Sequence, residues 1–536
     1  MQHIFSKNAL RFCIILPQIA ICIFLFITAS ISQVTSQNNE FQSIDYYVAQ
    51  NITKENILSH LKVLAADSLE GREFGTFGIN RAADYIVSRI SKAGLKPMGD
   101  RGTYYQPVIT EAWKWKKLSL RSSRARLTPG LDFDTRIWDN SNPMTLSADH
   151  VMYIGYGIND PSFNDYAFAQ GWGEVLLMLD DEPKRGNDYI ITGSAEPSQW
   201  SKNLDKKVAQ ALSKNAKAIL LIQNPDKFKK EIILGEQKIF TVDTTTRYPI
   251  PIIRINRKSL DKIFDAEQLK KLLQYIDFSE KGKITSNYLA CDFDFHSSLA
   301  KEKMLGRNII AAVEGTDPKK KYEWIILSAH YDHLGITNGQ INNGADDNGT
   351  GVSAIIEIAK SLQKLKNEGR ELDRSILVAF FTGEEKGLVG SQYFTSNPVL
   401  PLRMIKADIN IDMIGRSDNF HEPGENYVYS IGADKINPLI EKTLDVANYV
   451  SINYLLDKKY NAENHPSRLY YRSDHYSFAS RGIPSVFLFG GFHEDYHQPT
   501  DDIEKINLQK VQDIATMVYF ALIRLVNTPV ILTDYK

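Results

Sequence analysis

The chain has 536 residues, of which 43% are hydrophobic, 24% charged and 11% aromatic. A chain of this length exceeds one simple hydrophobic core, so two or more domains are expected. The 63 Lys and Arg residues nearly balance the 64 Asp and Glu residues, so no bulk positive charge favours a nucleic-acid partner, and none is predicted.

The first residues have the pattern of a targeting segment. Lys7 and Arg11 precede an apolar run over 12–31, and small or polar residues follow to Ser36. This pattern predicts a signal peptide over 1–36. The run also approaches the ~20 residues that span a bilayer, so retention as an N-terminal membrane anchor is the alternative. Either reading predicts export, to the periplasm, the extracellular space or an outward-facing anchor. Only Cys291 follows this segment, which excludes an intrachain disulfide after cleavage.

Three further regions differ in their patterns. Residues 45–126 begin with helical periodicity and are predicted as the first part of a catalytic domain. Residues 127–277 hold short β-like runs, such as HVMYIGYGI, GEVLLMLDD and AKAILLIQN, without a cluster of metal ligands. This region is predicted as an inserted β-rich domain that assists substrate access or partner contacts. Residues 278–536 are predicted as the second part of the catalytic domain.

In residues 278–536, predicted strands and helices alternate regularly. Strands are predicted in NIIAAVEG, YEWIILSAH, SILVAFFTG, MIKADINIDM and PSVFLF, with helices between them and a long helix near the end. Such alternation predicts a mixed, mostly parallel α/β sheet flanked by helices. Ligands of such sheets bind beyond the carboxyl ends of the strands. His330, Glu384, Asp412 and His497 each follow or end one of these apolar runs.

Each of these segments contains residues that could bind a metal ion or support one that does. Asp332, two residues after His330, could orient that imidazole. Of Asp346 and Asp347, in a Gly-rich loop, one acid could bridge two metals while its neighbour serves the loop. Of Glu384 and Glu385, one would bind metal and the other would take a proton from water. Asp412 is a carboxylate in an apolar run, which is costly to bury unpaired.

Nearby residues receive other interpretations. His333 is expected to pack or to hydrogen-bond locally. His475 is a candidate substrate contact or support for a ligand, and Arg472 a candidate partner for a substrate carboxylate. Ser473, Asp474 and His475 are adjacent in the chain, so they cannot form a serine triad.

Together, HxD, GADDN, GEE, a strand-borne DM and a late His resemble the co-catalytic zinc peptidases. That family includes leucine-type aminopeptidases, glutamate carboxypeptidase II and the inactive transferrin receptor. The resemblance covers nearly all of residues 53–530. The GYG-containing strand and AKAILLIQNPD of the insert resemble a protease-associated domain.

The resemblance implies two zinc ions and a peptide substrate. One zinc would be held by His330, Asp346 and Asp412, and the other by Asp346, Glu385 and His497, with a cis peptide bond after Asp346 in many relatives. Glu384 would be the general base, and Asp332 would orient His330. Aminopeptidase activity is expected. Carboxypeptidase or dipeptidase activity on the same centre, a glutaminyl cyclase and a receptor-like binding protein are the alternatives. Oligomeric state is not predicted.

Overall fold

A computed structural model describes residues 41–135, 144–167, 174–228, 239–240, 250–337, 339–462 and 465–529. The predicted targeting segment 1–36 lies outside these ranges. Within them, every helix is too short or too polar to cross a bilayer.

The chain divides into two compact units. One comprises Met1–Thr110 and Met304–Lys536, and the other comprises Glu111–Lys303. The second unit therefore extends beyond the predicted insert 127–277 on both sides. Two long strands, β2 (Tyr105–Arg121) and β14 (Asn287–Val313), continue across the two divisions. Because these strands have no linker composition, the sequence gives no sign of the boundaries.

The first unit contains a mostly parallel sheet with the strand order β21-β20-β22-β19-β15-β18-β14. Strands β18, β15, β19 and β22 run parallel as neighbours, whereas β14 and β20 pair antiparallel with them. The bounds are β15 (Trp324–His330), β18 (Ser375–Phe381), β19 (Ile405–Asp412), β20 (Tyr427–Ile431), β21 (Leu455–Asp457) and β22 (Ser485–Phe489). The four parallel strands are almost wholly buried, as expected where both faces are covered.

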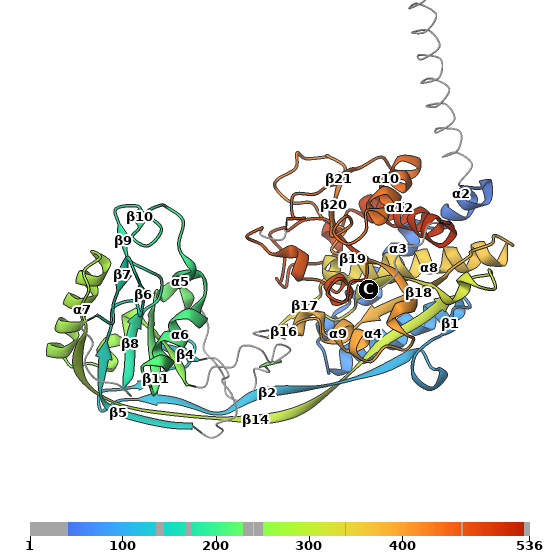
Figure 1. The fold of residues 1–536 in the computed structure, drawn as a ribbon. Helices are drawn as coiled ribbons and strands as arrows, with labels where there is room; N and C mark the ends of the chain where they lie inside the picture. The colour runs from blue at the N-terminus through green and yellow to red at the C-terminus, as the bar shows by residue number, and fades with distance from the viewer. Residues whose placement is uncertain are drawn as a thin grey trace, which may run out of the picture. The chain divides into compact units, whose positions relative to one another are not determined.

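Amphipathic helices cover this sheet (Figure 1). The longest are α12 (Leu508–Asn527), α8 (Gly351–Asn367), α4 (Phe77–Lys92) and α10 (Leu439–Ser451), and their apolar sides form one core with the sheet. The shorter helices are α2 (Ser43–Ala49), α3 (Lys54–Leu64), α9 (Val389–Ser396) and α11 (His475–Ala479). The predicted mixed, mostly parallel sheet flanked by helices is confirmed.

The second unit has its own parallel strands. The order is β14-β5-β8-β11-β13-β4, in which β5, β8, β11 and β13 are parallel neighbours. The bounds are β4 (Phe133–Thr135), β5 (Met144–Tyr153), β8 (Val175–Leu179), β11 (Ala218–Gln223) and β13 (Ile252–Asn256). Helices α5 (Gln199–Lys202), α6 (Leu204–Ser213) and α7 (Ala266–Glu280) accompany them, and a separate core holds the unit together. The similarity of this unit to protease-associated domains stays a prediction.

A buried pair of hydrogen-bonded side chains, His60 and Glu357, joins α3 to α8. His60 Nε2 lies 2.8 Å from Glu357 Oε1, and Lys360 Nζ donates to the same oxygen at 2.6 Å. Burial alone would raise the pKa of Glu357, but the hydrogen bonds from His60 and Lys360 outweigh it and hold the pKa below the ordinary 4.5. The folded chain therefore binds this proton less readily than the unfolded chain. The pair contributes stability above pH 4.5 that is lost as pH falls through the lowered pKa.

We expect Glu357→Gln to lower the thermal unfolding temperature of the first unit at pH 7. The difference from the unchanged chain should shrink as pH falls from 4.5 through the lowered pKa of the folded chain, because Glu357 is protonated in both states below that pKa. Calorimetry from pH 3 to pH 7 measures this. Glu368→Gln, at an exposed position directly after α8, is the control. A difference of the same size at every pH would contradict the assigned role of the pair.

Candidate metal centre

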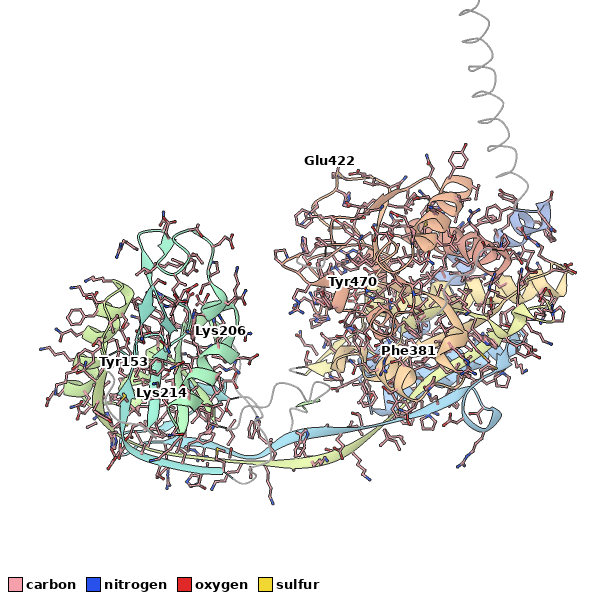
Figure 2. The ribbon with its side chains drawn as sticks, viewed as in Figure 1. Tyr153, Lys206, Lys214, Phe381, Glu422 and Tyr470 are labelled. Carbon is pink, nitrogen blue, oxygen red and sulfur yellow. The ribbon has the colours of Figure 1, made fainter. Side chains whose placement is uncertain are left out.

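The parallel strands of the first unit bring the predicted site residues to one edge of the sheet. His330 ends β15 and Asp412 ends β19. Glu384 and Glu385 follow the end of β18 at Phe381, which is labelled in Figure 2. His497 lies in the loop after β22. Because the carboxyl ends of parallel neighbours meet at the same edge, side chains far apart in the chain converge there.

Asp347 lies at the centre of this cluster. Its Oδ1 is 3.4 Å from His330 Nε2, which is 3.2 Å from Asp412 Oδ1. Its Oδ2 is 3.3 Å from His497 Nε2, which is 3.2 Å from Glu385 Oε2. The two carboxylate oxygens of Asp347 thus face two separate sets of imidazole and carboxylate groups.

The prediction that Asp346 occupies the shared position is wrong. Asp346 Oδ1 accepts hydrogen bonds from the Gly415 amide at 2.6 Å and from the Thr350 hydroxyl at 3.0 Å. Its Oδ2 lies 3.3 Å from His493 Nε2. The GADDN loop is not a regular helix at Asp347, so the two neighbouring acids point in different directions. The cis peptide bond expected after Asp346 lies between Asp347 and Asn348.

Asp332 supports the site differently from the expectation. Its carboxylate accepts hydrogen bonds from the amides of Glu384 at 3.0 Å and Glu385 at 3.2 Å, which fixes the turn that carries both glutamates. His330 Nδ1 is 3.2 Å from the Asp332 carbonyl oxygen but 3.8 Å from its carboxylate. The main chain of Asp332 therefore orients His330, and its side chain positions Glu384 and Glu385.

His333 belongs to the cluster, which the sequence did not indicate. Its Nδ1 is 2.8 Å from Glu385 Oε1 and 3.8 Å from Asp347 Oδ2. His333 and His497 therefore both approach Glu385, from its two oxygens. Only the HYDH spacing of His333 after His330 could have drawn attention to it.

The carboxylates and imidazoles of the cluster shift one another's pKa values. Burial would lower the pKa values of His330 and His497, but the nearby carboxylates outweigh it; they raise the first well above its ordinary value and the second to about 10. Burial raises the pKa of Glu384 well above its ordinary value. Burial would also raise the pKa of Glu385, but His333 and His497 outweigh it and hold that pKa well below the ordinary value. Protonated imidazoles thus supply the positive charge that the buried carboxylates need. Divalent cations bound by the same nitrogen and oxygen atoms would supply it equally.

Further residues hold two parts of the cluster in place, the loop that carries Asp347 and the side chain of Asp412. The Asp501 carboxylate accepts hydrogen bonds from the amides of Asp346 and Asp347, each at 3.1 Å. Ser473 Oγ donates to Asp412 Oδ2 at 2.8 Å. Neither role was predicted, because both rest on contacts between residues distant in the chain.

Arg72 ties the N-terminal segment to the site loops. It is 1% exposed, and its guanidinium donates to four carbonyl oxygens. These belong to Leu64, Tyr331 at 3.0 Å, Asn343 at 2.6 Å and Gly344 at 3.0 Å. The sequence marks this segment, LEGREFG, only as a Gly-rich loop.

We expect Arg72→Ala to lower the unfolding temperature of the first unit by several degrees. Each buried carbonyl left without a donor costs about 1–3 kcal/mol. Arg101→Ala is the matched control, because Arg101 is exposed and shares the positive φ, 55° against 52° for Arg72. An alanine at either position has the same strain from its positive φ, so this strain cancels in the comparison. Equal unfolding temperatures for the two variants would contradict this role.

The two predicted substrate contacts lie in different surroundings. His475 is fully buried between the rings of Tyr470 and Phe487, and burial lowers its pKa to about 3. Arg472 is partly exposed and donates to the Tyr496 hydroxyl at 3.2 Å. Their roles in substrate binding stay predictions.

Residues 308–522 match peptidase family M28. The chain carries an M28 peptidase domain. This confirms the predicted resemblance to co-catalytic zinc peptidases.

Curated relatives match part of the chain. Leucine aminopeptidase 2 of Trichophyton rubrum is 29% identical over 224 residues, which cover 37% of this chain and 41% of the relative. The chain thus matches about two fifths of that relative's length.

Solved structures share the fold over most of their length. An aminopeptidase from Aneurinibacillus sp. strain AM-1 is 19% identical and covers 89% of this chain and 95% of its own, with a TM-score of 0.56. A zinc aminopeptidase from Bacillus subtilis is 18% identical and covers 88% and 94%, with a TM-score of 0.50.

Proposed function

We propose that this M28 protein is a zinc-dependent aminopeptidase that removes N-terminal residues from peptides. The observation that carries the proposal is the position of Asp347, whose two carboxylate oxygens face two separate donor sets. A carboxylate shared in this way suits a pair of metal ions. The aminopeptidase names of the relatives and structural neighbours support the reaction.

The donor atoms fit two zinc ions. One would be held by His330, Asp347 and Asp412, and the other by Asp347, Glu385 and His497. Imidazole nitrogen and carboxylate oxygen are common zinc ligands in hydrolases. When bound, the ions would acidify a water molecule and polarise the scissile carbonyl group.

Glu384 is assigned as the general base. It is partly buried in electrostatic reach of His330 and Asp412, and desolvation raises its pKa well above the ordinary value. A carboxylate with a raised pKa accepts a proton from the attacking water more readily and then passes it to the leaving amine. The Asp332 carboxylate accepts hydrogen bonds from the amides of Glu384 and Glu385 and so keeps the turn of Glu384 in place.

A substrate panel with and without a chelator tests the reaction. Leucine nitroanilide should be hydrolysed, N-acetyl-leucine nitroanilide should not, and chelation should abolish hydrolysis, because an aminopeptidase requires a free α-amino group. Preferential cleavage of blocked peptides with a free carboxylate would indicate a carboxypeptidase instead. Cleavage of dipeptides but not of longer peptides would indicate a dipeptidase. Absence of hydrolysis with metal bound would indicate a receptor-like protein.

Export is part of the proposal, supported by the apolar run over 12–31 and the small residues that follow it. N-terminal sequencing of the protein recovered from cell fractions is the test. A mature chain that starts just after Ser36 is expected. An intact N-terminus in the membrane fraction would assign the run as an anchor, and an intact N-terminus in the cytoplasm would overturn export.

A further inference from the structure

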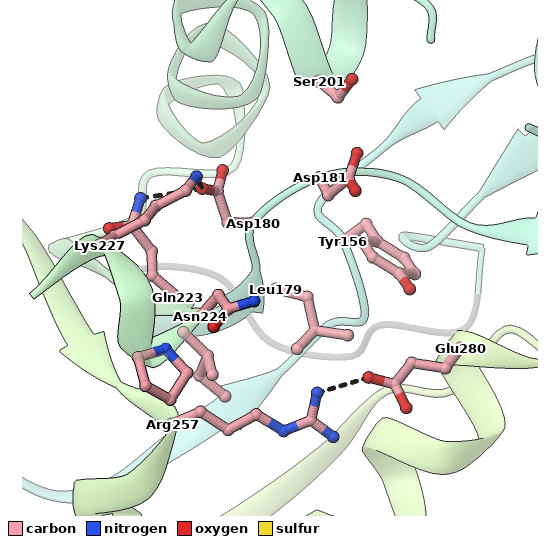
Figure 3. Close-up of a pocket in the computed structure, with 12 residues that line it drawn as sticks. Tyr156, Leu179, Asp180, Asp181, Ser201, Gln223, Asn224, Lys227, Arg257 and Glu280 are labelled. Atoms are coloured by element: carbon pink, nitrogen blue, oxygen red, sulfur yellow. Dashed lines mark hydrogen bonds and ion pairs between the residues drawn. The ribbon is translucent and has the colours of Figure 1, made fainter. Parts of the chain in front are cut away.

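The second unit contains a pocket of about 550 Å³ at the carboxyl ends of its parallel strands (Figure 3). Tyr156 follows β5, Asp180 and Asp181 follow β8, Gln223 ends β11, and Arg257 follows β13. We call it the strand-end pocket. In parallel α/β sheets, ligands bind beyond the carboxyl ends of the strands. The volume is also in the range of small-molecule sites, roughly 300–1,000 Å³.

Most charges around the pocket are already paired. Lys227 Nζ donates to Asp180 Oδ2 at 2.6 Å, and Gln223 Nε2 donates to the same oxygen at 2.8 Å. Arg257 Nη1 donates to Glu280 Oε1 at 2.6 Å. Asp181 differs, because its carboxylate has no hydrogen-bond or ion-pair partner among the residues that the structure describes.

Asp181, an exposed residue at the pocket, has an uncommon backbone conformation. Its φ is 82°, an uncommon value for a residue other than glycine. The buried Lys207 donates to the carbonyl oxygens of Asp181 at 2.6 Å and Leu179 at 3.2 Å. Burial lowers the pKa of Lys207 to about 8. An uncommon conformation that a buried side chain stabilises is often found at binding sites.

Asp181 and Arg257 lie on opposite sides of Leu179 in Figure 3, with the Tyr156 ring on the side of Asp181. The three charged groups of Asp181, Glu280 and Arg257 all line this one pocket, together with Tyr156. Arg257 uses only Nη1 for Glu280 and keeps its Nε and Nη2 groups for another acceptor. The apolar side chains of Leu179 and Ile222 complete the lining.

We propose that the strand-end pocket binds a small zwitterion, a free amino acid or a short peptide, at a site separate from the catalytic centre. Asp181 would accept hydrogen bonds from the α-ammonium group of the ligand, and Arg257 would donate to its carboxylate. Leu179, Ile222 and the Tyr156 ring would contact its side chain. The pocket contains none of the candidate metal ligands, so the proposal does not depend on the proposed peptidase activity.

Hydrogen–deuterium exchange of the full-length chain tests the proposal. The Glu384→Gln variant is used so that peptide probes are not hydrolysed, and the probes are leucine and Leu-Gly-Gly. Slower exchange is expected in segments 179–182, 223–228 and 256–258. If leucine slows exchange at a lower concentration than Leu-Gly-Gly, the ligand is a free amino acid. If Leu-Gly-Gly does so, the ligand is a short peptide. N-acetylation or C-amidation should weaken the protection about tenfold or more, because each removes one charge-assisted contact.

Matched variants assign the contacts. Asp181→Asn and Arg257→Gln should weaken the protection about tenfold or more. Asn also tolerates a positive φ, so Asp181→Asn keeps the backbone. Asp188→Asn and Arg185→Gln, at exposed positions of the same unit outside the pocket, should leave protection unchanged. Protection confined to segments around Asp347 and His497 would overturn the pocket and still support the peptidase. Absence of protection in the three segments at millimolar probe would also overturn it.

Discussion

Glu384→Gln is expected to lower kcat for leucine nitroanilide by about 10²–10⁴-fold, the usual contribution of general acid–base catalysis. Glutamine has nearly the same shape as glutamate but cannot take a proton from water. Zinc content should be unchanged, since Glu384 is not assigned as a ligand. Steady-state kinetics and elemental analysis of the same preparation measure both quantities.

Glu422→Gln is the control for this substitution. Glu422 is exposed and is labelled in Figure 2. The control should retain full activity. Undiminished turnover of Glu384→Gln would remove Glu384 as the base, and loss of zinc from that variant would make it a ligand instead.

Asp347→Ala is expected to reduce the zinc content of the dialysed protein from two ions per chain to less than one, with loss of hydrolysis. Asp347 contacts both donor sets, so its removal weakens both sites together. Asp346→Asn should keep nearly all the zinc, because the asparagine oxygen can still accept the hydrogen bonds from Gly415 and Thr350. Zinc loss from Asp346→Asn with retention in Asp347→Ala would restore the assignment that the structure contradicts.

The sheet of the first unit was predictable because its strands are short apolar runs that alternate with amphipathic helices. Residues 324–330, 375–381 and 485–489 are buried throughout, which leaves an unbroken hydrophobic pattern in the sequence. The positions of His330, Asp412 and Glu385 then follow from the rule for strand ends. These three positions can be predicted from the order of strands and helices in the chain alone.

The choice between Asp346 and Asp347 needs the backbone itself. Adjacent acids in an irregular loop differ only in direction. The direction is set by hydrogen bonds that Gly415 and Thr350 donate to Asp346, and by those that Asp501 accepts from the loop amides. The residues 415 and 501 lie far away in sequence, so no local pattern contains this information. The role of the buried Arg72 was missed for the same reason, because its acceptors in Tyr331, Asn343 and Gly344 lie at least 259 residues away in the chain.

The extent of the inserted unit was also beyond the sequence. Strands β2 and β14 contain residues of both units, and their alternating patterns continue without Gly or Pro at the divisions. The predicted boundaries at 127 and 277 follow a change in composition, whereas the structure divides the chain at 111 and 303. The carboxyl ends of β8, β11 and β13 form a pocket only once the parallel order of these strands is known.

The shared position of Asp347 is decided by X-ray diffraction from crystals of the zinc-loaded protein, with anomalous difference maps on both sides of the zinc edge. Two peaks are expected, one on each side of the Asp347 carboxylate. The first should lie beside His330 and Asp412, and the second beside Glu385 and His497. A single peak, or a peak between Asp346 and His493, would contradict the two-metal centre proposed for this protein.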